Sequence, residues 1–285
     1  MLPTHPFRDV QRIEYSLWHV LSLARYLAYV IDSFYLCTIY ATIATLELKT
    51  DNTMANYVTS ETRAQSMVST LFKSLYMQMA AALAVTGLTA YFASQSVAFW
   101  NMLATNPSML WILVIAQIGL VIWLSARVMH MSMGMATTLF IVYSVLMGVT
   151  LSSIFLVYDM GTIATTFFVT AGTFFTMSLV GYTTRMDLSR LGNILYMMLI
   201  GLVIATVVNI FVASTTLYWI TTYAGVIIFV GLIAWDTQKL RNLFLEYGSA
   251  DEGGQKLALI GALTLYLDFI NLFLYLLRIF GSNRD

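Results

Sequence analysis

Long apolar runs, each long enough to form a membrane-spanning helix, alternate with short polar connections along most of this chain. A helix needs about 20 mostly apolar residues to cross the hydrocarbon core of a bilayer. Seven runs meet this requirement, and their connections are too short to hold a soluble domain. The pattern therefore predicts an all-α polytopic membrane protein, a bundle of seven spanning helices. The predicted helices cover residues 71–95, 108–128, 136–158, 161–182, 193–213, 217–246 and 256–280.

The composition agrees with this class. Of the 285 residues, 59% are hydrophobic and 10% are charged, whereas soluble domains carry about 25% charged residues. A formal net charge of zero gives no basis for binding nucleic acid. Cys37 is the single cysteine, so an intrachain disulfide or a CxxC metal or redox site is excluded.

Lysine and arginine are unequally divided between the two sets of connections. Cytoplasmic loops of membrane proteins carry an excess of these residues. If the N-terminus is cytoplasmic, the outer connections near 96–107, 159–160 and 214–216 hold none of them. Arg278 and Arg284 would lie outside, as mild exceptions. The inner connections would hold Arg127, Arg185, Arg190, Lys239, Arg241 and Lys256.

The N-terminal part differs from the rest. Residues 17–46 are apolar but are interrupted by charged residues, and an eighth helix there would reverse the orientation. We expect residues 1–60 to be an N-terminal extension and residues 61–285 to be the seven-helix domain. Met54 begins a polar lead-in suited to a natural start, which would make residues 1–53 an upstream extension of the reading frame.

Small residues in the first predicted helix suggest how it packs. Ala80, Ala84 and Gly87 recur at helical spacing, and small residues on one face let membrane helices approach closely. We expect these three to form a packing seam.

Two aspartates stand inside the last two predicted spans. A carboxylate there costs about 3 kcal/mol on insertion scales, so it normally faces a protein interior or a wet cavity. Asp268 lies about 18 Å from the inner end of its helix at 1.5 Å per residue. Asp236 reaches the same depth if its helix continues to Glu246, with Gly248 as the C-terminal cap. The two carboxylates can then meet.

Such a pair has clear chemical consequences. Two carboxylates in contact do not both ionise easily, so they would share a proton and respond to pH. Their oxygens also suit a hard cation such as calcium. Asn271, one turn beyond Asp268, could add an amide partner. The alternative is a buried pair that only locks two helices together. Arg127 is either an interfacial anchor or a counter-charge that reaches the pair.

Enzymatic motifs are missing from the sequence. It contains no glycine-rich phosphate loop, HExxH zinc pair or GxSxG elbow, and its three histidines are scattered. The YD and GxGD contexts of intramembrane aspartyl proteases are missing around Asp236 and Asp268. We therefore expect a protein that is not an enzyme and needs no cofactor, with calcium entering only as a transported ion.

Four segments resemble the Bax inhibitor-1 family, also called the transmembrane Bax-inhibitor-motif family, and its bacterial members in particular. The resemblance covers about residues 60–282 and several motifs occur in the right order. The segments are YSVLMGVTLSSIFLVY, GYTTRMDLSRLGN, VGLIAWDTQKLRN and LTLYLDFINLFLYLLRIFG.

The resemblance implies a seven-helix bundle with the C-terminal helix at its centre and a pH-sensitive calcium leak across the membrane. It implies that Asp236 and Asp268 form a di-aspartyl pH sensor, and Arg127 is the best match to an arginine latch on that pair. Some relatives instead bind a membrane protease or suppress cell death. A bacterial-type member is expected in the inner membrane.

Three functions are therefore open. The first is a pH-gated cation leak, in which Asp236 and Asp268 gate the pore and can bind calcium. The second is a regulatory protein that binds a membrane protease or a stress or cell-death partner. The third is a proton-coupled secondary transporter, in which the same carboxylates relay protons.

Overall fold

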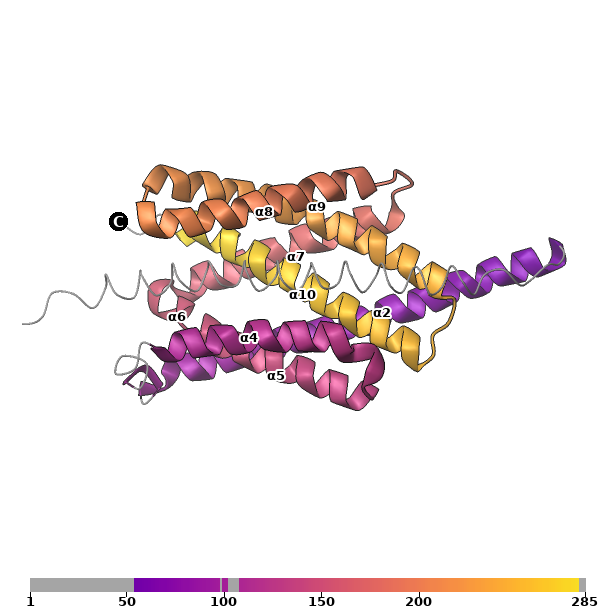
Figure 1. Ribbon diagram of the computed structural model, residues 1–285, viewed down its shortest axis with the longest axis horizontal. Helices are drawn as coiled ribbons and strands as arrows, with labels where there is room; N and C mark the ends of the chain where they lie inside the picture. Colours follow the sequence, from indigo (N-terminus) through magenta and orange to yellow (C-terminus); the bar gives the residue numbers. More distant parts are fainter. Residues whose placement is uncertain (1–53, 98, 102–107, 282–285) are drawn as a thin grey trace, which may run out of the picture.

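The computed structural model describes residues 54–97, 99–101 and 108–281, and its regular elements are all helical (Figure 1). Within these residues, seven helical stretches are long and apolar enough to cross a membrane. The predicted class, an all-α bundle of seven spanning helices, is confirmed. The elements are α2 (Met54–Gln95), α4 (Ser108–Arg127), the 3-10 turn η1 (Val128–His130), α5 (Met133–Leu151), α6 (Ile154–Val157), α7 (Met160–Thr183), α8 (Ser189–Val212), α9 (Thr215–Tyr247) and α10 (Glu252–Gly281).

Short polar residues set several helix ends. The side chains of Ser132, Asp159 and Ser214 each accept a backbone N–H from the first turn of α5, α7 and α9. Such N-caps satisfy donors that have no partner inside the helix. At the other end of α9, Gly248 adopts a left-handed conformation with φ 71° and its N–H donates to the carbonyl of Phe244. The continuation of α9 to Glu246 and its cap at Gly248 are as predicted.

The third predicted span is interrupted. A single helix over residues 136–158 was expected, but α5 ends at Leu151 and the one-turn α6 follows. The hydroxyls of Ser152 and Ser153 donate to the carbonyls of Val149 and Thr150. These local bonds compete with the regular helical pattern and favour a turn at this point.

The helix α2 begins earlier than expected, at Met54 rather than residue 71. The predicted start marked the beginning of the apolar run, but a helix can extend beyond the apolar segment into polar sequence. Figure 1 shows this end of α2 projecting past the other helices. The helix passes without a break through the expected domain boundary at residue 60. The expectation for residues 1–53 lies outside the described residues.

The predicted packing seam on α2 is wrong. Ala80, Ala84 and Gly87 are exposed, and a side chain on Gly87 would meet nothing within 4 Å. The close approach is made by another face, where Gly148 of α5 lies against the backbone carbonyl of Thr86. Spacing identifies a stripe of small residues, but it does not say whether lipid or protein covers that stripe.

The C-terminal helix α10 is the centre of the bundle, as the resemblance implied. It contacts α2, α5, α7 and α9, and 94% of its most apolar 18-residue window is buried. Figure 1 shows α10 running obliquely between α7, α8 and α9 on one side and α2, α4 and α5 on the other. The outer helices expose large apolar side chains, such as Phe168, Phe175 and Phe211, as expected for a surface that lipid covers.

Candidate functional site

Asp236 of α9 and Asp268 of α10 are both buried in this bundle, with exposed fractions of 2% and 0%. Each aspartate stands within a long apolar stretch of its helix, and its burial places it between helices. Their burial agrees with the rule that charged groups in spanning segments face the protein interior.

The contacts between α9 and α10 show that the two helices pack antiparallel along much of their length. Near one end, Gly225 of α9 lies against the ring of Tyr275. Near the other end, a side chain on Gly261 of α10 would lie 2.9 Å from Cδ2 of Leu240. The aspartates lie between these two contacts, on the stretch where the helices are in direct contact.

A third contact indicates how the two aspartates are placed along the helix pair. The rings of Phe229 and Tyr275 are stacked, with centroids 5.6 Å apart. Asp236 follows Phe229 by seven residues, and Asp268 precedes Tyr275 by seven. Residues seven apart lie on nearly the same face of a helix, two turns away. This register places Asp236 and Asp268 on the facing surfaces of α9 and α10 at closely similar levels. That the two carboxylates act as one pair stays a prediction.

A polar cluster adjoins Asp236. The hydroxyl of Thr237 lies 3.4 Å from that of Ser178 on α7, and Tyr76 of α2 lies close to both hydroxyls. One turn away, Gly181 of α7 touches the backbone of Ala234. Helices α2, α7 and α9 thus meet around Thr237 and Ala234, which lie one and two residues from Asp236 in α9.

The surroundings of Asp268 are more aromatic. Phe269 packs edge-on against Phe174, with ring centroids 5.6 Å apart. Two residues before the aspartate, the Tyr266 hydroxyl lies 2.7 Å from the hydroxyl of Thr86 on α2. Through these large side chains α10 packs against both α2 and α7, which holds the helix that carries Asp268 in place.

The two secondary candidates lie in different places. Asn271 is buried, and its amide nitrogen donates to the carbonyl of Leu267 at 2.7 Å. It therefore lies in the core next to Asp268, as expected, but this amide N–H bonds to its own helix. Arg127 is the last residue of α4 and is exposed. The latch assigned to it stays a prediction.

Sequence reasoning missed a buried arginine. Arg278, in the last turn of α10, is 4% exposed and lies over the rings of Tyr218 and Tyr275 at 5.2 Å from each centroid. It was expected on the outer side of the membrane, as a mild exception to the charge rule, and its burial does not test that expectation. The signal was its position directly after Leu276 and Leu277, inside the apolar run. Cation–π contacts of this kind stabilise a desolvated guanidinium.

Metal-ligating side chains do not cluster within the described residues. No group of three or more His, Cys, Asp or Glu side chains in this part of the chain could hold a metal ion. Calcium usually takes six to eight oxygen ligands, and the aspartate pair offers two carboxylates. Calcium binding at Asp236 and Asp268 stays a prediction.

The fold and its charge distribution define a multi-pass integral membrane protein with an ionisable pair in its core. The family model described as "Inhibitor of apoptosis-promoting Bax1" matches residues 68–285. The chain belongs to this family, the Bax inhibitor-1 family, as its sequence motifs indicated.

Several curated proteins are similar over most of this length. The "Inner membrane protein YbhL" of Escherichia coli (strain K12) is 51% identical over 218 residues, covering 76% of this chain and 93% of its own. An uncharacterised protein of Rickettsia prowazekii (strain Madrid E) is 41% identical over 74% of this chain and 89% of its own. One of Deinococcus radiodurans is 39% identical over 81% and 98%.

Proposed function

We propose that this protein is a pH-sensitive cation leak of a bacterial inner membrane, that calcium is the ion, and that Asp236 and Asp268 form the gate. The observation that supports the gate is their burial on the facing surfaces of α9 and α10. The name of the Escherichia coli relative, an inner membrane protein, supports the assignment to the inner membrane. The orientation with a cytoplasmic N-terminus rests on the distribution of lysine and arginine.

Like charges at this position make the α9–α10 interface responsive to protons. When the pair shares one proton, it carries a single negative charge and can form a hydrogen bond between its carboxyl groups. When that proton leaves, two negative charges face each other in a medium of low effective dielectric, where their repulsion is much stronger than in water. A cation or a displacement of the helices relieves this repulsion, which links proton binding to ion passage.

Arg127 is proposed as a latch on the resemblance alone. In this conformation it is exposed at the end of α4, so the latch requires a second conformation in which its guanidinium approaches one of the carboxylates. In that case Arg127→Gln would shift the pH at which half of the maximal flux occurs and leave flux itself in place.

The test is calcium flux into proteoliposomes across about pH 5 to 8, a range in which a coupled carboxyl pair can titrate. Asp236→Asn and Asp268→Asn keep the side-chain shape and remove the ionisable group. Asp187→Asn is a matched control because Asp187 is exposed in the α7–α8 connection. We expect the pH midpoint to move or vanish in the two core variants and to stay in the control.

Other results would favour the two alternatives. Flux that both core variants leave unchanged would reject the aspartate gate. Saturable uptake of one solute driven by a proton gradient would favour a proton-coupled transporter. Absence of flux at every pH, with a membrane protein partner that co-purifies in stoichiometric amount, would favour a regulator and reduce the pair to a helix lock.

A further inference from the structure

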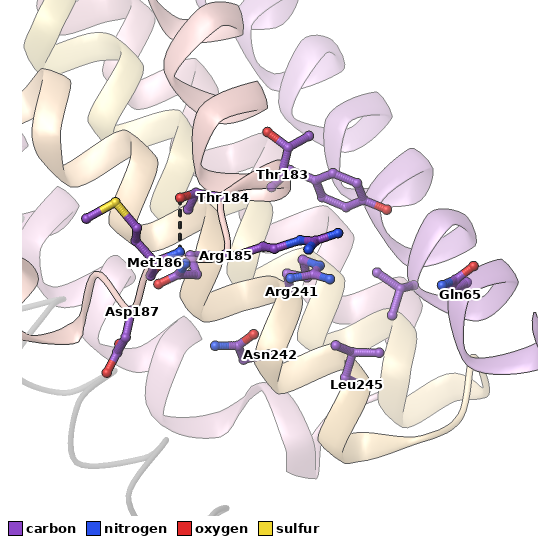
Figure 2. A pocket seen from close by; sticks show the side chains of 12 residues that line it. Gln65, Thr183, Thr184, Arg185, Met186, Asp187, Arg241, Asn242 and Leu245 are labelled. Carbon is purple, nitrogen blue, oxygen red and sulfur yellow. Dashed lines mark hydrogen bonds between the residues drawn. The ribbon is translucent and has the colours of Figure 1, made fainter. Parts of the chain in front are cut away.

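A cavity of about 610 Å³ lies at the basic end of the bundle, and neither Asp236 nor Asp268 lines it. Its walls come from α2, from the connection between α7 and α8, and from the last turns of α9 (Figure 2). Ligand pockets commonly have volumes of roughly 300–1,000 Å³. Nothing in the proposed gate uses this space.

One wall of the cavity is held in place by a buried glutamine. Gln238 of α9 accepts the backbone N–H of Leu188 through Oε1 at 2.8 Å and donates through Nε2 to the carbonyl of Met186 at 2.7 Å. The Thr184 hydroxyl also accepts the N–H of Met186 at 3.2 Å. These bonds join the α7–α8 connection to α9, so the connection is a built wall of the cavity. Arg185 lies within this fixed segment.

Positive charge predominates in the cavity. Its charged lining residues are Arg185, Arg241 and Asp187. The Arg241 guanidinium lies over the ring of Tyr182, 5.8 Å from its centroid, which limits the directions in which it can point. Arg185 and Arg241 line the same cavity, and in Figure 2 Asp187 points away from both.

The carboxylate of Asp187 is engaged elsewhere. Its Oδ1 accepts the N–H of Ser189 at 2.9 Å, and hydrogen bonds from Ser189 lower the pKa of this exposed carboxyl below its ordinary 3.8. It therefore carries its charge at neutral pH but directs it at the start of α8. Two guanidinium groups remain in the cavity, and the amides of Gln65 and Asn242 line it as well.

We propose that this cavity binds a phosphate group, with Arg185 and Arg241 as its two principal ligands. Planar guanidinium groups form paired hydrogen bonds with phosphate oxygens. Basic pockets between spanning helices on the cytoplasmic side are sites for the headgroups of anionic lipids. The cavity also has an apolar border, Val68 and Leu245, beside which the start of an acyl chain can lie. The same chemistry fits free phosphate.

The test is binding to the purified full chain, with Arg185→Gln and Arg241→Gln as the variants. Arg190→Gln is the matched control, because Arg190 is an exposed arginine of the same region that does not line the cavity. Phosphatidylglycerol and phosphatidylcholine are titrated in detergent and counted by native mass spectrometry. Inorganic phosphate is titrated separately and followed by its effect on the thermal midpoint.

We expect phosphatidylglycerol to bind the parent protein more tightly than phosphatidylcholine. Each cavity variant should lose about tenfold in affinity, the usual scale for one charge-assisted hydrogen-bonding group, and Arg190→Gln should match the parent. If inorganic phosphate binds with this same dependence and the lipid does not, the site is retained and its ligand is soluble. Equal losses of affinity in all three variants would overturn the proposal. It would also be overturned if phosphatidylglycerol bound no better than phosphatidylcholine and inorganic phosphate did not bind.

Discussion

Helices α8 and α10 are both strongly apolar, yet they occupy opposite environments. In the most apolar 18-residue window of each, 33% of α8 is buried compared with 94% of α10. The exposed residues of α8 include Ile194, Met197 and Phe211, with Phe211 exposed by 84%. Lipid tails are as apolar as a protein core, so apolar character alone does not decide which helix lies inside.

The polar residues inside the apolar runs mark the difference. Within its buried stretch, α10 carries Tyr266, Asp268, Asn271 and Arg278, whereas α8 has few such residues. The same rule operates within α8, where the buried Asn209 faces protein and accepts the N–H of Ser214. A polar side chain at membrane depth therefore indicates the face that other helices cover.

The largest expected contrast is between side chains shortened to alanine in α10 and in α8. Leu272→Ala in α10 removes a fully buried side chain and leaves a cavity, so we expect a loss of about 2–5 kcal/mol in the free energy of unfolding. Met197→Ala in α8, where the side chain is 69% exposed, should change it by less than about 0.5 kcal/mol. Denaturant titration in micelles measures both. Equal losses would contradict the central position of α10.

A second contrast uses glycine. A side chain on Gly181 of α7 would collide with the backbone of Ala234, whereas one on Gly201 of α8 would meet nothing within 4 Å. Gly181→Ala should therefore cost about 1–3 kcal/mol through overpacking. Gly201→Ala should be neutral or slightly stabilising, since alanine favours the helix by up to about 1 kcal/mol. Thermal unfolding of both variants checks this, and similar midpoints would refute the α7–α9 contact.

A smaller effect is expected from one hydroxyl group in the core. Tyr266→Phe removes the oxygen 2.7 Å from the Thr86 hydroxyl and should reduce stability by about 1 kcal/mol. The matched change Tyr223→Phe alters a side chain that is 53% exposed and should have no measurable effect. If Tyr223→Phe reduces stability as much as Tyr266→Phe, the Tyr266 hydroxyl makes no contribution specific to the core.

The smallest effect concerns the start of α10. Asp251 accepts the N–H of Gly254 at 3.0 Å, which lowers the pKa of this carboxyl from its ordinary 3.8. A lowered folded-state pKa stabilises the protein above the unfolded-state value, and this contribution disappears as pH falls through the lower value. In Asp251→Asn, thermal stability should therefore fall less than in the parent as the pH drops below about 4. If the thermal midpoint of the variant falls with pH below about pH 4 as steeply as that of the parent, Asp251 makes no such contribution.

Much of the fold could be predicted because it depends on the length of apolar runs. The seven spans found in the described part of the chain were all predicted, and the end of α9 followed from Gly248. The break after Leu151 was missed because hydroxyl-to-backbone bonds at a serine pair leave no trace in the apolar pattern. The seam on α2 was placed on the wrong face because spacing does not distinguish lipid from a neighbouring helix.

The candidate site was only partly predictable, for a related reason. The insertion cost singles out Asp236 and Asp268 wherever the other helices lie, and helix length fixes their depth. A long charged side chain near the end of a span can take two directions. It can extend to water, or it can turn inward between the helices. Arg127 takes the first and Arg278 the second. Sequence alone did not separate the two arginines.

The central claim is that the two core aspartates act as one titrating unit. The direct measurement compares the pH dependence of calcium flux in Asp236→Asn, Asp268→Asn and the double variant. Residues of one unit show strongly non-additive effects. We predict that either single substitution abolishes the parental pH dependence and that the double variant adds nothing further. Two partial effects that sum in the double variant, or a parental profile in either single variant, would contradict the account.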